Sequence, residues 1–175
     1  SMAPDVFVQS TVNRASQILS SDIPKETKIE KLKLIAEETV DITGIGFYTL
    51  GSFRKTLSDD QKKTYKDLFK NYFLKSFSSR LAEYSNPEIQ VNSKEVLSDK
   101  YTIVSSILVA TDDRPEVKID WRIYTKNPSN PLIRDLIIEG LSLARTQKEE
   151  FASIINSNDG NISALFDTLE KFISN

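Results

Sequence analysis

The segment "DLIIEGLSLARTQKEEF", Asp135–Phe151, changes from a strand pattern to a helix pattern within a few residues. Its first part is rich in aliphatic residues, which favour strands when turn residues bound them. Gly140 permits a tight turn. The pattern therefore predicts a last strand over about 132–139 and a helix over about Ser142–Ile155, with the serine as N-cap.

Leu141 and Leu143 lie in the connector between this strand and this helix. Connectors are usually polar because their backbone faces water. Two interpretations remain open at this point. The leucines either fix the start of the helix against the core or line the mouth of an apolar ligand pocket.

Upstream of this segment the apolar residues recur with a period of two, which indicates strands. Short turns separate these stretches, so successive strands are predicted to pair antiparallel. The middle stretch is apolar at both odd and even positions, which predicts a central strand covered on both faces. The predicted strands cover about 88–97, Tyr101–Thr111 and 116–123.

The remaining segments have apolar residues at helical spacing. Ser58 and Gln61 have the spacing of a capping box, which marks the start of the longest helix. The helices are predicted over about Pro4–Leu19, Lys25–Val40, a short apolar stretch within Asp41–Phe53, Ser58–Tyr84 and Asn161–Ile173.

These elements predict an α+β fold, with helices packed on a strongly twisted four-stranded antiparallel sheet. We expect a cone-like molecule with an apolar cavity between sheet and helices. A chain of 175 residues suits one domain with a core of its own. We place that domain at 3–174 and interpret residues 1–2 as a remnant of cloning, with any signal peptide already removed.

The composition excludes several kinds of site. There is no cysteine and no histidine, so thiolate chemistry and histidine catalysis are excluded. The net charge is −2 with mixed signs along the chain, which argues against nucleic acid as a partner. The glycines at 44, 46 and 51 match neither the dinucleotide fingerprint nor the P-loop. No calcium loop or other metal motif occurs.

Two other functions stay open, an interaction module whose core is filled by side chains and, as the first alternative, an enzyme that uses one of two acidic residues. Asp120 and Asp135 are flanked by apolar strand residues and are candidates for buried acid/base groups. A small enzyme acting on an apolar ligand could use either one. No G-x-S-x-G motif supports a serine nucleophile.

Three parts of the chain resemble the MlaC / toluene-tolerance family of periplasmic phospholipid-binding proteins. They are "TLGSFRKTLSDDQKKTYKDLFKNYFLKSFSSRL" (49–81), "VKIDWRIYTK" (117–126) and "RDLIIEGLSLARTQKEEF" (134–151). The resemblance runs in register over nearly the whole chain. One departure is the tryptophan that the family usually carries before the aspartate of the fourth strand, because Pro131, Leu132 and Ile133 precede Asp135 here.

The resemblance implies a carrier without catalytic residues, metal or cofactor, with a phospholipid as cargo. Such proteins hold the acyl chains in an apolar pocket. They exchange the lipid between an outer-membrane lipoprotein–porin complex and an inner-membrane ABC transporter with an MCE-domain subunit, and so maintain outer-membrane lipid asymmetry. We expect a monomer in the periplasm. The predicted lipid-binding residues are Phe47, Leu50, Phe53, Phe69, Tyr72, Phe73, Ile103, Ile107, Val117, Ile119, Trp121, Ile138, Leu141 and Leu143.

Overall fold

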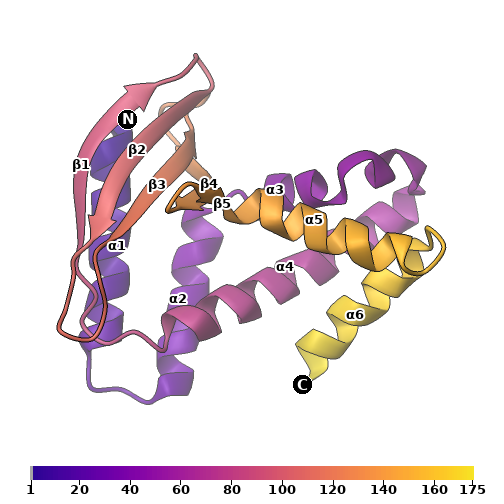
Figure 1. Cartoon of the computed structure of the whole chain (residues 1–175), viewed down its shortest axis with the longest axis horizontal. Helices are drawn as coiled ribbons and strands as arrows, with labels where there is room; N and C mark the ends of the chain where they lie inside the picture. Colours follow the sequence, from indigo (N-terminus) through magenta and orange to yellow (C-terminus); the bar gives the residue numbers. More distant parts are fainter. Residues whose placement is uncertain (1) are drawn as a thin grey trace.

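The computed structural model describes residues 2–175, and its elements follow the predicted order of helices, strands and helices. Figure 1 shows the sheet at one end, with α1 along it and α3 to α6 gathered at the other end. The helices are α1 (Pro4–Ser20), α2 (Lys25–Thr39), α3 (Ile42–Leu50), the 3-10 helix η1 (Gly51–Thr56), α4 (Asp59–Leu81), α5 (Leu143–Asn156) and α6 (Ile162–Ser174). The strands are β1 (Ile89–Val96), β2 (Tyr101–Leu108), β3 (Val117–Tyr124), β4 (Leu132–Ile138) and β5 (Leu141–Ser142).

Local capping chemistry fixes the starts of the helices. At α4 the predicted capping box is present, because Gln61 N donates to Ser58 Oγ at 3.1 Å and Ser58 N donates to Gln61 Oε1 at 2.9 Å. Ser142 is the N-cap of α5 and accepts from Arg145 N at 3.1 Å. The predicted N-caps are therefore confirmed. The end of α4 is not, since this helix stops at Leu81 rather than Tyr84.

The sheet has five antiparallel strands in the order β1-β2-β3-β4-β5, so the predicted count of four is wrong. The extra strand is the leucine-bearing connector itself, because Leu141 pairs with Ile138. Glu139 and Gly140 form the turn between them, with φ of 50° and 81°. Positive φ at both central residues is the geometry of a type I′ hairpin, whose twist matches that of the strands.

Only one face of β2 is buried, so the prediction of cover on both faces is wrong. Burial alternates along the strand, with even-numbered residues buried and odd-numbered residues half-exposed. We call the side of Val104 the inner face and the side of Ile103 the outer face. Helix α1 lies along the sheet on one side (Figure 1), which accounts for the one-sided burial.

The two edges of the sheet are covered by different means. The β4 edge pairs with β5 at one end, and at the other end Asp41 N donates to Ile133 O at 3.0 Å. At the β1 edge the Gln9 amide of α1 bonds to the backbone of Ile89 and Val91, at 3.3 and 3.2 Å. Edge strands expose unpaired backbone groups, and these contacts satisfy part of them.

A continuous cluster of buried apolar residues joins the inner face to the helices. It includes Val104 and Ile123 from the sheet, Val8 from α1, Tyr65 from α4 and Leu165 from α6, each with no exposed area. Among residues 2–175 no helix is both long enough and apolar enough to cross a membrane.

Candidate apolar ligand site

The inner face of β3 and β4 carries most of the strand residues that were predicted to bind a ligand. Ile119 and Trp121 are buried on β3, and Val117 is half-buried at the start of the same strand. Ile138 lies opposite Ile119, and Leu136 lies opposite Trp121. Directly opposed residues share one face of a sheet, so these five side chains form one apolar surface, which we call the inner-face patch.

Two successive hydrogen bonds satisfy the indole N–H of Trp121, so this patch presents no unpaired polar group from the tryptophan. The indole Nε1 donates to Ser106 Oγ at 2.9 Å, and Ser106 Oγ donates to the Ile119 carbonyl at 2.8 Å. A buried indole N–H usually needs a partner, and Ser106 supplies it from β2. Sequence reasoning missed Ser106. Its even position on β2, shared with Val104, was the available signal.

The helical residues predicted to bind a ligand come together on α3, η1 and α4. Leu50 and Phe69 are buried, whereas Phe47, Phe53, Tyr72 and Phe73 are half-buried and pack against the core. Gly46 allows α3 to approach α4, because a Cβ built there would lie 2.8 Å from Phe69 Cδ2. Phe69 and Phe73 stack with centroids 6.1 Å apart. The helices thus present a second apolar surface.

The tyrosine hydroxyls in this helical layer are also satisfied. The hydroxyls of Tyr65 and Thr49 lie 2.7 Å apart in a hydrogen bond. Tyr72 donates to Gln147 Oε1 at 3.0 Å. Burial raises the pKa of both phenols, and the charge of Glu150 raises the pKa of Tyr72 further. Both side chains are therefore neutral at ordinary pH, as an apolar surface requires.

The connector leucines lie at the border of the inner face. Leu141 shares this face with Ile138, its register partner on β4, and its side chain is 58% exposed. Leu143 is half-buried at the first position of α5. The exposure of Leu141 does not fit a leucine that fixes the helix start inside the core.

Ile103 and Ile107 do not join the other predicted residues. In the β2–β3 register they lie opposite Arg122 and Lys118, on the outer face. The inner-face patch is on the other side of the same strands. The prediction that they line a common space with Trp121 is therefore wrong, because period-two alternation separates neighbouring residues to opposite faces.

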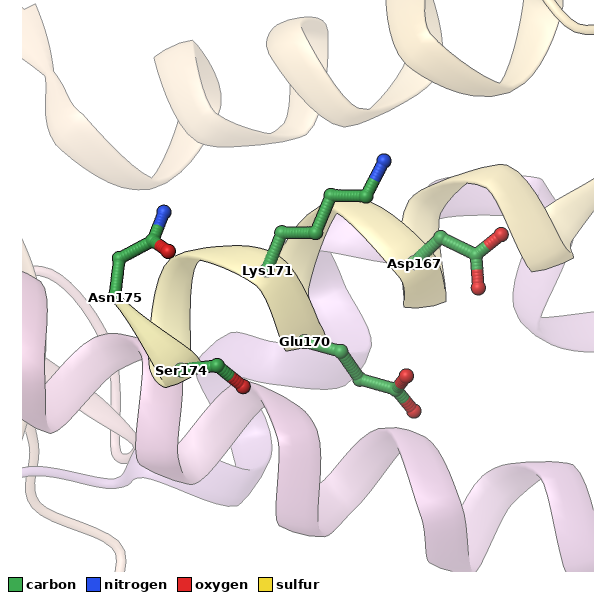
Figure 2. A pocket seen from close by; sticks show the side chains of 5 residues that line it. All are labelled: Asp167, Glu170, Lys171, Ser174 and Asn175. Carbon is green, nitrogen blue, oxygen red and sulfur yellow. The ribbon is translucent and has the colours of Figure 1, made fainter.

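Two open surface hollows lie away from the inner face. One is a polar hollow on α6 (Figure 2), lined by Asp167, Glu170, Lys171, Ser174 and Asn175. The other follows the exposed side of α1 and is lined by Val6, Gln9, Ser10, Asn13, Arg14 and Gln17. The inner face and the helices instead contact each other through their apolar side chains. A ligand between them requires these side chains to separate.

The two acidic candidates have different surroundings. Asp135 accepts hydrogen bonds from the Ser142 hydroxyl and, at 3.0 Å, from Ala144 N, and so holds the start of α5. Asp120 lies on the outer face, and its buried Oδ1 has no hydrogen-bond partner among residues 2–175. In the same range no cluster of acidic side chains could hold a metal ion. Because its carboxylate holds the start of α5, Asp135 has a structural role.

Comparison with known proteins agrees with this architecture. A sequence search finds no match among curated proteins. A solved structure, described as the phospholipid-binding protein from Ralstonia solanacearum in complex with a phospholipid, superposes with a TM-score of 0.82. It shares 20% identity and covers 99% of this chain and 98% of its own, so it shows the same fold. The family model described as "MlaC protein" matches residues 9–171. The chain belongs to the MlaC family.

Proposed function

We propose that this protein is a periplasmic phospholipid carrier without catalytic activity. Family membership is the observation that carries the proposal. The relative from Ralstonia solanacearum was solved with a phospholipid, which supports the same cargo here. The apolar surfaces and the absence of histidine and cysteine also favour binding over catalysis.

The acyl chains lie between the inner-face patch and the aromatic surface of α3, η1 and α4. Leu141 and Leu143 stand at the border of this space, and Ile103 and Ile107 take no part in it. The half-buried state of Val117, together with that of Phe73, supports this location. Such side chains contact the core yet retain exposed apolar area that a ligand can cover.

The energetics of transfer favour a surface of this kind. Two acyl chains carry roughly 30 methylenes, and at ~0.8 kcal/mol each their exposure to water would cost about 24 kcal/mol. A carrier must replace most of that free energy with apolar contacts, and it must still release the lipid. A wide apolar surface binds the acyl chains without specific polar contacts that would prevent release. Its polar groups are hydrogen-bonded within the protein, as those of Trp121 and Ser106 are.

The carrier exchanges its lipid as a monomer with two membrane complexes. One is an outer-membrane lipoprotein–porin complex, and the other is an inner-membrane ABC transporter with an MCE-domain subunit. This cycle maintains the lipid asymmetry of the outer membrane. The basis for these partners is the resemblance of segments such as 134–151 to the family.

Mass spectrometry of organic extracts tests the binding of lipid. Protein purified from its native source, under non-denaturing conditions, is expected to release phospholipid in a constant ratio to protein. Repeated extraction without phospholipid would contradict the proposal.

Two matched variants test the location of the lipid. Val117→Asp places a charge on the inner face, whereas Ile107→Asp places the same charge on the outer face, close by in the β2–β3 ladder. Both positions are half-buried aliphatic residues. Val117→Asp is expected to lose the lipid and Ile107→Asp to keep it, while circular dichroism shows both folded. Equal lipid content in the two variants would reject this location.

A further inference from the structure

The free edge of β1 adjoins the exposed side of α1 at the edge of the sheet opposite to β5. β1 is the outermost strand, and α1 runs beside it (Figure 1). Gln9 belongs to both, because it lines the hollow on α1 and its amide bonds to the backbone of Ile89 and Val91. This region lies apart from the inner-face patch on β3 and β4.

The second half of β1 has backbone groups that point away from the sheet. Leu97 N donates to Tyr101 O at 2.9 Å, so the backbone of Leu97 faces β2. Alternate residues of an antiparallel strand turn their N–H and C=O groups away from the neighbouring strand, so those of Lys94 and Val96 point outward. Among residues 2–175 no hydrogen bond from a side chain or a loop reaches these outward groups. They can therefore pair with an added strand.

The Gln9 amide shows how main chain fits this edge. Its nitrogen donates to Ile89 O at 3.3 Å, and its oxygen accepts from Val91 N at 3.2 Å. A residue of a parallel neighbouring strand makes the same two bonds, to the C=O of one residue and to the N–H two positions further on. The first half of the edge thus already has an amide partner, whereas the second half is open.

Two features that usually keep edge strands from pairing do not block the open half. Edges are commonly protected by bulges and by charged side chains. The bulge of β1 lies between Val91 and Ser93, so the ladder with β2 is regular from Ser93 to Val96. Lys94 Nζ pairs with Asp5 of α1 at 3.2 Å, which holds the lysine against the helix and offsets its charge.

Exposed apolar side chains flank the open half. Val96 is 70% exposed and shares the α1 side of the sheet with Lys94, because both lie opposite buried residues of β2. Val6 is 54% exposed and follows Asp5, the partner of Lys94. The ion pair therefore brings the two valines to the same end of α1. Amide and hydroxyl side chains form the rest of this side of the helix: Gln9, Ser10, Asn13 and Gln17.

We propose that the open half of β1, together with Val6 and the amide-lined side of α1, binds an extended, uncharged segment of a partner protein as an added strand. The outward groups of Lys94 and Val96 need donors and acceptors at the spacing of a strand. An extended polypeptide presents them, as in other complexes formed by strand addition. Side chains on one side of the segment would contact the two valines. We call this surface the edge site.

The charges beside the edge site favour a neutral segment from a different protein. Asp5 pairs with Lys94, and Arg14 pairs with Glu38. A second copy of β1 fits the open half poorly, because the two-fold registers that use its outward groups place two copies of either Lys94 or Glu95 directly opposite each other. The edge site goes beyond the proposed function, because it takes main chain rather than lipid.

A titration followed by two-dimensional NMR of isotopically labelled protein tests the proposal. The probe is a short acetylated and amidated peptide of alternating threonine and valine. It is expected to shift the amide resonances of Lys94 and Val96 and to slow the exchange of both amide protons with solvent. A fully N-methylated form of the same peptide keeps the side chains but has no N–H donor. It is expected to bind about tenfold more weakly, because it cannot donate to the edge.

Two variants at one position separate backbone from side chain. Val96→Pro removes an outward N–H, which proline can do on an edge strand without breaking the ladder. It is expected to bind the unmethylated peptide about tenfold more weakly. Val96→Thr keeps the N–H and the branched shape, and is expected to bind like the wild type. Circular dichroism compares the folds, and the N-methylated peptide tests the wild type without any substitution.

Several results would overturn the proposal. Equal affinity of the wild type for the two peptides would mean that side chains alone make the contact. Shifts confined to the inner-face patch, or unchanged affinity of a folded Val96→Pro, would place the peptide elsewhere. Absence of binding to the unmethylated peptide would also reject the edge site. A concentration-dependent dimer that is lost in Val96→Pro would identify a second copy as the occupant instead.

Discussion

Trp121 and Ser106 are joined across the β2–β3 ladder by a hydrogen bond of 2.9 Å from the indole nitrogen to the serine hydroxyl. Both side chains are buried, and the serine hydroxyl in turn donates a hydrogen bond to the Ile119 carbonyl. The pair holds a large aromatic ring on the inner face without leaving a polar group unsatisfied. The apolar character of the proposed lipid surface thus depends on a polar residue beneath it.

Ser106→Ala is expected to lower the free energy of unfolding by about 1–3 kcal/mol, because it leaves the buried indole N–H without a partner. Urea denaturation followed by tryptophan fluorescence measures the change, since Trp121 is the single tryptophan. Ser105→Ala is the control, because Ser105 is half-buried on the outer face opposite Asp120. A loss of equal size in the control would contradict a specific role for Ser106.

Gln9→Leu is expected to expose the edge of β1. The amide satisfies backbone groups of Ile89 and Val91, so its loss should cost about 1 kcal/mol and promote edge-to-edge self-association. Light scattering with size-exclusion chromatography over a range of concentrations detects this. Gln17→Leu, on the exposed side of the same helix, should elute like the wild type. If the two variants associate equally, added surface hydrophobicity is the cause rather than the opened edge.

Asp135→Ala is expected to destabilise the protein by about 1–2 kcal/mol, because the carboxylate holds Ser142 and Ala144 at the start of α5. Asp120→Ala should be neutral or slightly stabilising, since the buried Asp120 Oδ1 has no hydrogen-bond partner in residues 2–175. Thermal unfolding monitored by circular dichroism compares the two. A reversed order would mean that the outer-face carboxylate has a stabilising contact and that the cap is dispensable.

Stability is expected to fall above about pH 10, the ordinary pKa of tyrosine. Burial raises the pKa of Tyr65 in the folded protein. Above pH 10 the unfolded chain releases this proton while the folded chain retains it. The free energy of unfolding then decreases by about 1.4 kcal/mol per pH unit from this group.

Tyr65→Phe removes the contribution of the Tyr65 phenol to the pH dependence of stability. The free energy of unfolding of this variant should therefore decline less steeply above pH 10. The variant also loses the hydrogen bond to Thr49, so its stability at pH 7 is lower. Urea titrations at several pH values between 8 and 11.5 give both quantities. Parallel declines for the two proteins would show that Tyr65 does not titrate differently in the folded state.

The local pattern of the sequence was enough to predict the order and type of the helices and of the first four strands. Helical spacing located the helices, period two located β1 to β3, and an aliphatic-rich segment located β4. Capping chemistry located starts such as Ser58 and Ser142, because a cap depends on residues within one turn of itself. The fifth strand was missed because Leu141 and Ser142 pair through a two-residue turn, too short a segment to show a period.

The candidate site could be predicted only in part. Alternation correctly grouped Val117, Ile119 and Trp121 on one face of β3. Alternation could not tell which side of β2 lies on the same face as Trp121, because β2 has apolar residues on both sides. Ile107 was therefore assigned to the wrong face.

The sequence by itself determined the α+β order, the N-caps of α4 and α5 and the family, since each depends on neighbouring residues or on a pattern along the chain. The tertiary structure alone decided that Ser106 supports Trp121, that Gln9 covers β1 and that Leu141 stands beside Ile138 at the border of the inner face. The physical reason is register. Which residues meet across strands and helices depends on how distant segments are aligned, and a shift of one residue moves every side chain to the opposite face.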